Sequence, residues 1–268
     1  MQIIEVQFAP WDQSYFFLPQ DEAGSSLDLK IGDSVIAETS LGVDLGTVAE
    51  IGELYELPPK ADQIKPVKRK ATDEDRLIFF ELNKNKGGFC QIARELIKKH
   101  QLAMKFIDAY ISFDDQRLTL AFIADGRIDF RELVKELGRA ARKNVRLHQI
   151  GVRDEAKFKG DFGPCGRPLC CQAHLKVLGN VSNEFAQFQQ VAHRGSDRLS
   201  GVCNRLKCCL RFEQPVYEEM AKGFPKIGSR LKTQYGEGEV IAWYPLKGKV
   251  GVNIGTEERP EMVEVEVK

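Results

Sequence analysis

The chain has 268 residues, carries 39 Lys and Arg against 39 Asp and Glu, and is 43% hydrophobic. That length is enough for two modest domains or one elaborated domain with a buried core, and the composition excludes a disordered or fibrous protein. The N-terminus alternates apolar and polar residues, and no apolar run is long enough to span a bilayer, so we expect neither a secretory signal nor membrane insertion, but a cytoplasmic protein.

Residues 1–58 predict a β-rich N-terminal element. Short runs of apolar and β-branched residues at 15–18, 33–39 and 46–51 are separated by turn residues, as expected for successive strands. The sequence KIGD at 30–33, followed by GTV at 46–48, is echoed near the other end of the chain by KIGS and GEV. This echo predicts two similar β-elements, although turns of the same type would give the same pattern.

Residues 59–152 predict a ferredoxin-like α+β core with the order βαββαβ. Thr72 and the acidic residues after it are typical of a helix start, and the following helix is interrupted near Gly87-Gly88. A hairpin turn is expected at Asp114-Asp115-Gln116, and Asp129 is expected to cap a second helix. The four expected strands lie at 64–67, 104–113, 118–123 and 145–150.

The remainder of the chain predicts two further segments. Residues 153–222 form a Cys-rich region with short helices, and residues 223–268 form a C-terminal SH3-like β-element. The whole is predicted as an α+β protein, in which small barrel-like elements flank the ferredoxin-like core and the Cys-rich region is an insert.

The zero net charge hides an uneven distribution. The segment from Arg131 to Arg211 contains 16 Lys and Arg against 7 Asp and Glu, a surplus of nine positive charges. Such a surplus attracts RNA, DNA or an acidic partner, although a solvated basic face would have the same composition.

Two copies of one motif contain six of the seven cysteines. The sequences GPCGRPLCC at 163–171 and GVCNRLKCC at 201–209 share the pattern Gly-x-Cys-x-Arg-x-x-Cys-Cys. The seventh cysteine, Cys90, stands alone in a predicted helix and is expected to be a small buried residue. The candidate ligands of a metal or cofactor are therefore Cys165, Cys170, Cys171, Cys203, Cys208 and Cys209.

Thiolates clustered in this way favour a metal site, holding either zinc or an iron–sulfur cluster. Each vicinal pair points its two sulfurs in different directions, so one zinc ion would not use both without strain. Core packing of the cysteines and a redox-sensing thiol pair are the alternatives. Arg167 and Arg205 would offset thiolate charge or reach phosphates, and with Lys207 they are the predicted nucleic-acid or partner surface.

The sequence resembles the family that takes its name from the yeast polymerase suppressor protein, through that family's conserved C-terminal domain. The similarity rests on VRLHQIGVRDEAK at 145–157, on DGRIDFRELVKELGR at 125–139 and on the two cysteine motifs. The family usually has Cys-Gly-Arg in both motifs. The second motif departs from this pattern, because it reads Cys203-Asn204-Arg205.

The resemblance implies a non-enzymatic regulator that acts in RNA processing with partner proteins. It implies a [4Fe–4S] cluster on the six motif cysteines, two small helical partner proteins and an endoribonuclease. The alternative is a protein that binds RNA or DNA directly and carries a structural zinc site. The two differ in whether RNA is contacted through partners or by the basic segment itself.

Overall fold

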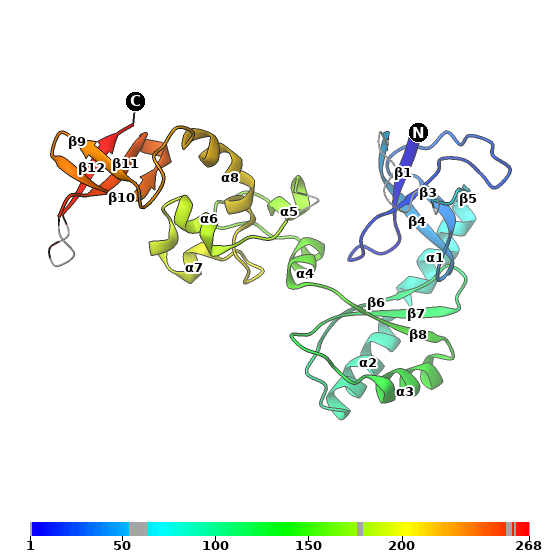
Figure 1. Ribbon diagram of the computed structural model, residues 1–268. Helices are drawn as coiled ribbons and strands as arrows, with labels where there is room; N and C mark the ends of the chain where they lie inside the picture. Colours follow the sequence, from blue (N-terminus) through cyan, green and yellow to red (C-terminus); the bar gives the residue numbers. More distant parts are fainter. Residues whose placement is uncertain (1, 54–63, 176–178, 256–258, 260, 268) are drawn as a thin grey trace. The chain divides into compact units, whose positions relative to one another are not determined.

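The computed structural model describes residues 2–53, 64–175, 179–255, 259 and 261–267. Its contacts divide the chain into two units, Met1–Phe158 and Lys159–Lys268, which are described separately below (Figure 1). Within the described residues, no helix has the length and apolar character needed to cross a membrane. The predicted boundary between residues 58 and 59 lies outside the described residues, and the four predicted segments remain a prediction.

The first unit begins with a five-stranded antiparallel sheet of order β2-β1-β4-β3-β5. One face is a core of buried aliphatic residues, among them Ile4, Val6, Val35 and Val48. The β-rich character expected of the N-terminus is therefore present. Its strands are β1 (Gln2–Gln7), β2 (Tyr15–Phe17), β3 (Ser34–Thr39), β4 (Gly42–Glu53) and β5 (Val67–Lys70).

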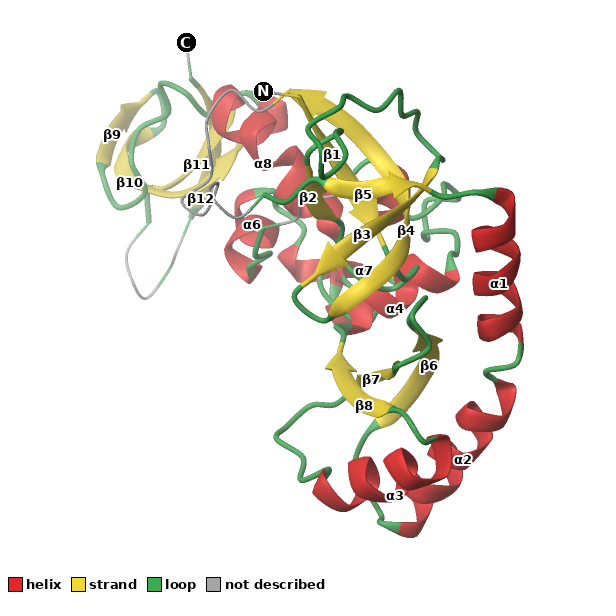
Figure 2. Cartoon of the chain, turned by 90° about the vertical axis from the view of Figure 1, so that its right-hand side faces the viewer, coloured by secondary structure: helices red, strands yellow, loops and turns green. Residues whose placement is uncertain are grey.

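A second layer in this unit combines a three-stranded sheet with helices. The sheet order is β6-β7-β8, with β6 antiparallel and β8 parallel to β7. Helices α2 and α3 cover one face of this sheet (Figure 2). Cys90 and Leu137 are buried there, and burial raises the pKa of the Cys90 thiol. The elements are α1 (Asp73–Lys84), α2 (Gly87–Lys99), β6 (Lys105–Ile111), β7 (Arg117–Ile123), α3 (Arg131–Ala141), β8 (Asn144–Gln149) and α4 (Val152–Lys159).

The α+β class is confirmed, and the elements from β5 to β8 follow the expected order βαββαβ, with the first helix divided into α1 and α2, but they do not form one ferredoxin-like sheet. The strand expected to open that unit is β5, and it pairs with β3 of the N-terminal sheet. It pairs there because Val67 is fully buried in the core of that sheet, next to Val35 and Ala37. Without this strand, β8 lies directly beside β7, where a ferredoxin-like sheet would insert the missing strand between them.

The local helix and turn signals are present as expected, with the exception of the cap at Asp129. The Thr72 hydroxyl accepts a hydrogen bond from the Asp75 N–H at 3.2 Å, which caps α1. The helical stretch is interrupted between α1, which ends at Lys84, and α2, which begins at Gly87. In the turn between β6 and β7, Asp115 adopts φ 57°. Asp129 does not cap α3 as its N-cap residue; its carboxylate accepts from the Arg131 N–H at 3.1 Å.

A buried ion pair joins the two layers of the first unit. Asp44 is 2% exposed and accepts hydrogen bonds from Arg117 Nη2 at 2.7 Å, the Tyr110 hydroxyl at 2.8 Å and the Phe113 N–H at 3.0 Å. Burial raises the pKa of the Asp44 carboxyl, and these donors oppose the shift. Asp44 is in β4 and its partners are in or next to β6 and β7, so the pair fixes how the two sheets pack.

The second unit contains short helices followed by a four-stranded antiparallel sheet of order β12-β11-β10-β9. Val240, Val250 and Val252 are fully buried in its core. The pairings among its described strands leave β9 and β12 as edges, so this SH3-like element is an open sheet. Its elements are α5 (Cys170–Ala173), α6 (Asn183–Phe188), η2 (Ala192–Arg194), α7 (Ser196–Leu199), α8 (Cys208–Met220), β9 (Arg230–Thr233), β10 (Gly236–Tyr244), η3 (Pro245–Lys247), β11 (Lys249–Asn253) and β12 (Met262–Glu266).

The echo between the two β-elements is real at the level of main-chain hydrogen bonds. The Gly32 N–H donates to the Val48 carbonyl at 2.8 Å, and the Gly228 N–H donates to the Val240 carbonyl at 2.7 Å. In each case the valine N–H donates back to the residue after the glycine, at 2.8 and 2.9 Å. Both glycines have positive φ, 92° and 84°. The two units therefore contain the same hairpin.

Replacing Asp44 with Asn is expected to destabilise the first unit by about 3–5 kcal/mol, because the change keeps the side-chain shape but leaves Arg117 buried without a counter-charge. The chain has two tryptophans. A Trp243→Phe background leaves Trp11, which packs edge-on against Tyr110, as the fluorescent reporter of this unit during urea unfolding.

The matched control for Asp44→Asn is Glu136→Gln, which removes one carboxylate from an exposed pair with Lys99. Exposed pairs contribute little, so its unfolding midpoint is expected to stay at the wild-type value. Equal midpoints for the two variants would show that the buried pair does not hold the layers together.

Candidate functional site: a duplicated cysteine loop

The two cysteine motifs fold as the same loop. In the first copy the Gly163 N–H donates to the Arg167 carbonyl at 2.8 Å, and in the second the Gly201 N–H donates to the Arg205 carbonyl at 2.9 Å. In each copy an antiparallel bridge flanks this hydrogen bond, and a second main-chain hydrogen bond, at 3.1 and 2.8 Å, closes the base of the loop. The repeat seen in the sequence is therefore also a structural repeat.

A left-handed residue stands at the tip of each loop. Gly166 has φ 77° and Asn204 has φ 56°, and the N–H of each donates to the carbonyl of its motif glycine at 2.9 Å. Glycine adopts this conformation without strain, and Asn is among the residues that tolerate it best. The replacement of glycine by Asn204 in the second copy thus preserves the loop.

Each loop leads directly into a helix whose first two residues are the vicinal cysteine pair. Helix α5 begins with Cys170, and α8 begins with Cys208. The residues before them have nearly the same backbone angles, φ −55° and ψ 129° for Leu169 and φ −56° and ψ 128° for Lys207. Successive helical side chains point about 100° apart, so the two thiols of a pair diverge, as expected from the sequence.

The structure brings thiols of the two copies together. The Cys170 and Cys208 side chains are hydrogen-bonded, and Cys171 and Cys209 lie close enough to affect Cys208 electrostatically. Burial, reinforced by these three neighbouring thiols, raises the pKa of Cys208 to about 11. Burial, with Glu213 and Cys170, also raises the pKa of Cys209. Reactive thiols have lowered pKa values, so these shifts disfavour the redox-sensing interpretation.

The first cysteine of each motif packs within its own loop. A Cβ atom placed on Gly163 would lie 3.4 Å from the Cys165 sulfur, and one on Gly201 would lie 3.8 Å from the Cys203 sulfur. Cys165 is exposed and Cys203 is half-buried. Both thiols belong to the loops themselves and not to the helix starts, where the other four cysteines lie.

The four thiols at the helix starts, Cys170, Cys171, Cys208 and Cys209, fit a thiophilic metal centre in their chemistry. Soft thiolates are the ligands that iron–sulfur clusters and zinc prefer, and the positive charge of such a centre would favour thiolate over the neutral thiol. Within the described part of the chain, however, no three or more Cys, His, Asp or Glu side chains already stand as a metal-binding group. The donor type therefore fits, whereas the ligand geometry is not preformed.

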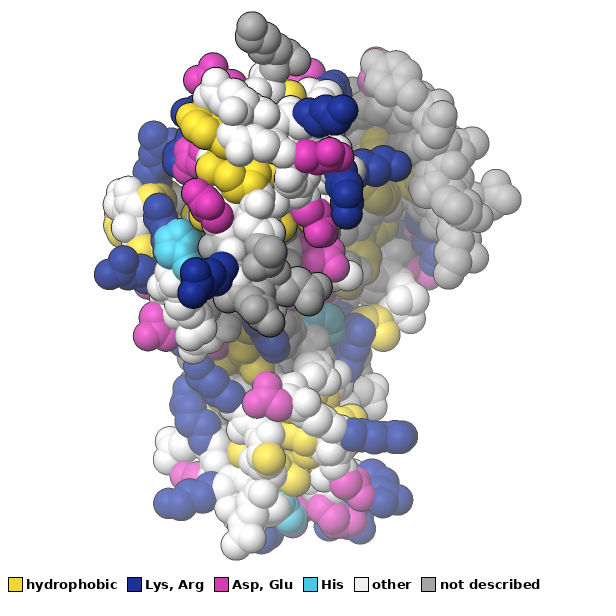
Figure 3. Space-filling view, turned by 60° about the vertical axis from the view of Figure 1, so that its left-hand side comes forward, with side chains coloured by type: hydrophobic (Ala, Val, Ile, Leu, Met, Phe, Trp, Pro, Cys, Tyr) yellow, Lys and Arg dark blue, Asp and Glu magenta, His cyan; other side chains and the backbone are white. Residues whose placement is uncertain are grey.

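The predicted nucleic-acid or partner surface divides into two parts. Arg167 and Arg205 lie in the two loops, and the main-chain carbonyl of each accepts the hydrogen bond that closes its loop. Lys207 directly precedes α8, and its ammonium instead donates to the carbonyl of Arg198 in α7. On the face that Figure 3 presents, Lys and Arg side chains are interspersed with Asp and Glu, so the basic surplus of the sequence does not form one broad patch there.

Two buried glutamines, which were not among the predicted site residues, hold the helix of the second cysteine pair. Gln189 Nε2 donates to the Leu210 carbonyl at 2.6 Å and to Gln214 Oε1 at 3.1 Å. Both glutamines are nearly inaccessible, at 5% and 6% exposure. They join the end of α6 to α8. Glutamine is usually exposed, so the sequence carried no signal for this role.

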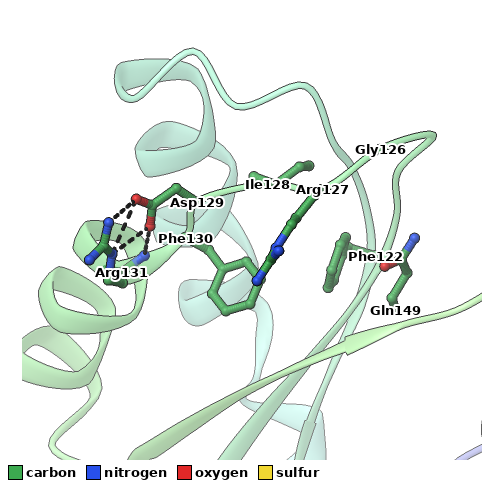
Figure 4. Close-up of a pocket in the computed structure, with 8 residues that line it drawn as sticks. All are labelled: Phe122, Gly126, Arg127, Ile128, Asp129, Phe130, Arg131 and Gln149. Carbon is green, nitrogen blue, oxygen red and sulfur yellow. Dashed lines mark hydrogen bonds and ion pairs between the residues drawn. The ribbon is translucent and has the colours of Figure 1, made fainter.

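A separate cavity of about 670 Å³ lies in the first unit, at the loop before α3. Figure 4 shows Arg127 extending toward Phe130, with Phe122 on its other side. The Arg131 guanidinium is held by the Asp129 carboxylate, with Nη2 to Oδ2 at 2.5 Å, and this pairing lowers the pKa of Asp129 to about 2. Because this pair is internally neutralised, the cavity is a weaker candidate for a charged ligand.

The fold and the site together define a class of two-unit α+β proteins in which a duplicated cysteine loop follows the mixed-sheet layer. Residues 65–150 match the sequence model of the PSP1 C-terminal conserved region, and residues 180–224 match that of the PSP1-like protein, third domain. The chain is 34% identical over 257 residues to the "Stage 0 sporulation protein YaaT" of Bacillus subtilis (strain 168), covering 96% of this chain and 91% of that protein. The chain therefore belongs to the PSP1 family.

The two matched regions include the second cysteine copy but not the first. The conserved region spans β5 to β8 and ends at residue 150, before the first copy. The third-domain match includes the second copy and all of α8. The first copy, at 165–171, lies between the two matched regions. No solved structure matches the chain.

The left-handed position at each loop tip predicts which substitutions the cysteine loops accept. Gly166→Asn and Asn204→Gly are expected to leave stability almost unchanged. Gly166→Val and Asn204→Val are each expected to cost about 1–2 kcal/mol, because a β-branched residue is strained at positive φ. Urea unfolding followed by Trp243 fluorescence, in a Trp11→Phe background, measures the effect in the second unit. Valine variants as stable as the wild type would show that the tip conformation is not required.

Proposed function

We propose that the protein is a non-enzymatic cytosolic adaptor whose duplicated cysteine loops hold a metal centre, an iron–sulfur cluster of the [4Fe–4S] type, and which acts in RNA processing or its regulation through partner proteins. A structural zinc ion is the alternative occupant. The observation that carries the proposal is the contact between Cys170 and Cys208, with Cys171 and Cys209 beside them.

The two loops supply more thiols than one zinc ion coordinates. Four cysteines lie at two helix starts, and Cys165 and Cys203 stand one loop away. Zinc in structural sites takes four ligands, and the diverging vicinal pairs do not all point at one ion. A cluster with several iron atoms accepts thiolates from more directions. Because no ligand set is preformed in the described residues, we propose that a partner chain or a local shift completes the site.

The regulatory role is proposed from the family and not from the site geometry. The name of the Bacillus subtilis relative places that protein in sporulation. For this chain we carry over only a role in regulation, exercised with small helical partners and an endoribonuclease as the family resemblance implies. The positive surplus around the loops supports binding of acidic partners or of RNA.

Anaerobic purification followed by iron, sulfide and zinc measurements tests the metal centre. We expect a brown protein with broad visible absorption and matching iron and sulfide contents. Cys170→Ser and Cys208→Ser are each expected to lose most of the iron. Cys90→Ser is the matched control, because Cys90 lies on the buried face of α2 in the other unit, and it is expected to keep the wild-type metal content.

Each outcome of the metal measurements has a defined meaning. Stoichiometric zinc in a colourless protein would replace the cluster with the structural zinc alternative. Full iron content in both serine variants would exclude Cys170 and Cys208 as ligands. A protein free of every metal after anaerobic preparation, with both variants folded, would refute the metal centre altogether.

The adaptor role predicts co-purification with partner proteins that survives nuclease treatment. Tagged full-length protein, isolated anaerobically from its own organism after nuclease digestion, is expected to retain specific partners. Cys208→Ser is expected to retain fewer of them, and Cys90→Ser is expected to retain all. Partners that disappear with nuclease alone would favour direct binding of nucleic acid.

A further inference from the structure

A groove of about 450 Å³ lies in the second unit, on the side of α8 next to the second cysteine loop. Its walls come from the segment after α6, from η2 and α7, from one face of α8 and from η3. On α8 the lining residues Leu210, Glu213 and Tyr217 follow a spacing of three and four, so they share one helical face. The volume is in the range of sites for small ligands, roughly 300–1,000 Å³.

The groove is positively charged. Four cationic side chains line it, against the single carboxylate of Glu213. Two of the cations are engaged by groups of the protein: Lys247 pairs with Glu264 at 2.7 Å, and Lys207 donates to a main-chain carbonyl. Arg194 and Arg198 have no ion-pair partner among the described residues. Both arginines are exposed and line the same groove, and the guanidinium group is well suited to bind phosphate.

Aromatic rings lie beside these cations. Tyr217 and Tyr244 both line the groove, and the Lys247 ammonium lies 5.1 Å from the centre of the Tyr244 ring. Burial and Glu213 raise the pKa of Tyr217, and the charge of Arg194, which lines the same groove, opposes that shift. A phosphate-binding group next to an aromatic ring is the combination that recognises a nucleotide.

We propose that this groove binds a nucleotide, with the phosphate on Arg194 and Arg198 and the base against Tyr217. The ligand is either a free mononucleotide or a nucleotide within single-stranded RNA. An acidic peptide would use the arginines but would leave the rings without a role. The proposal goes beyond the adaptor function. Lys207 and Cys209 of the second cysteine motif also line the groove, but the residues assigned to the phosphate and the base lie outside both motifs.

Binding of two probes to the full-length protein tests the groove. AMP is titrated by calorimetry, and fluorescein-labelled oligoadenylate is titrated by fluorescence anisotropy. Arg194→Gln and Arg198→Gln are each expected to weaken binding about tenfold, since each removes a charge-assisted hydrogen bond to phosphate. With oligoadenylate, each variant is also expected to make the salt dependence shallower by about 0.7. Tyr217→Leu tests the stacking surface independently.

The matched control is the double variant Arg230→Gln/Lys232→Gln, which removes two cations from β9 of the same unit and leaves the groove intact. It is expected to bind both probes as the wild type does. Binding of AMP and oligoadenylate with similar affinity identifies a free nucleotide, whereas binding of oligoadenylate alone identifies RNA. Metal content is measured on the same preparations and is expected to be equal in all of them.

Three results would overturn the proposal. The first is that neither probe binds the wild-type protein. The second is that the β9 variant weakens binding as much as the groove variants do. The third is that polyglutamate displaces the probe as well as unlabelled oligoadenylate does while Tyr217→Leu binds normally, which would make the groove a site for an acidic peptide.

Discussion

One main-chain hydrogen bond, made twice, determines where the cysteine pairs lie. In each loop the motif glycine donates to the motif arginine carbonyl, which turns the chain back and places the next cysteines at the start of a helix. The hydrogen bond uses the arginine carbonyl and leaves its guanidinium available to other groups. The loop therefore supplies a defined thiol position and a positive charge at the same time.

That arrangement explains why cysteine and basic residues alternate in this segment. Burial, together with the neighbouring thiols, raises the pKa of Cys208, so this thiol resists ionisation unless positive charge is added. The proposed metal centre would supply most of that charge. The cysteine motifs themselves contain three further positive charges, on Arg167, Arg205 and Lys207. These would offset the remaining negative charge of the thiolates, so a basic segment is the expected surrounding of a multi-thiolate site.

The sequence predicted local structure better than it predicted pairing. The cap at Thr72, the turn at Asp115 and the repeat of the cysteine loops all depend on neighbouring residues, and all are present. The strand β5 was assigned to the wrong sheet, because alternation of side chains shows that Val67 is buried but not against which core. The groove was missed for the same reason, since Arg194, Tyr217 and Tyr244 come from separate elements that only tertiary packing brings together.

Backbone constraints explain which positions are repeated in this chain. In the two related hairpins, a Cβ on Gly46 would lie 2.4 Å from Val6 Cγ1, and one on Gly238 would lie 2.4 Å from the Asn253 carbonyl oxygen. Neither position has room for a side chain, whereas the residues around them differ between the copies. The loop tips are less strict, because positive φ admits Asn204 as well as Gly166. A sequence pattern that specifies the residue types compatible with the backbone at each position, and not one residue identity, would therefore match both copies of each repeat.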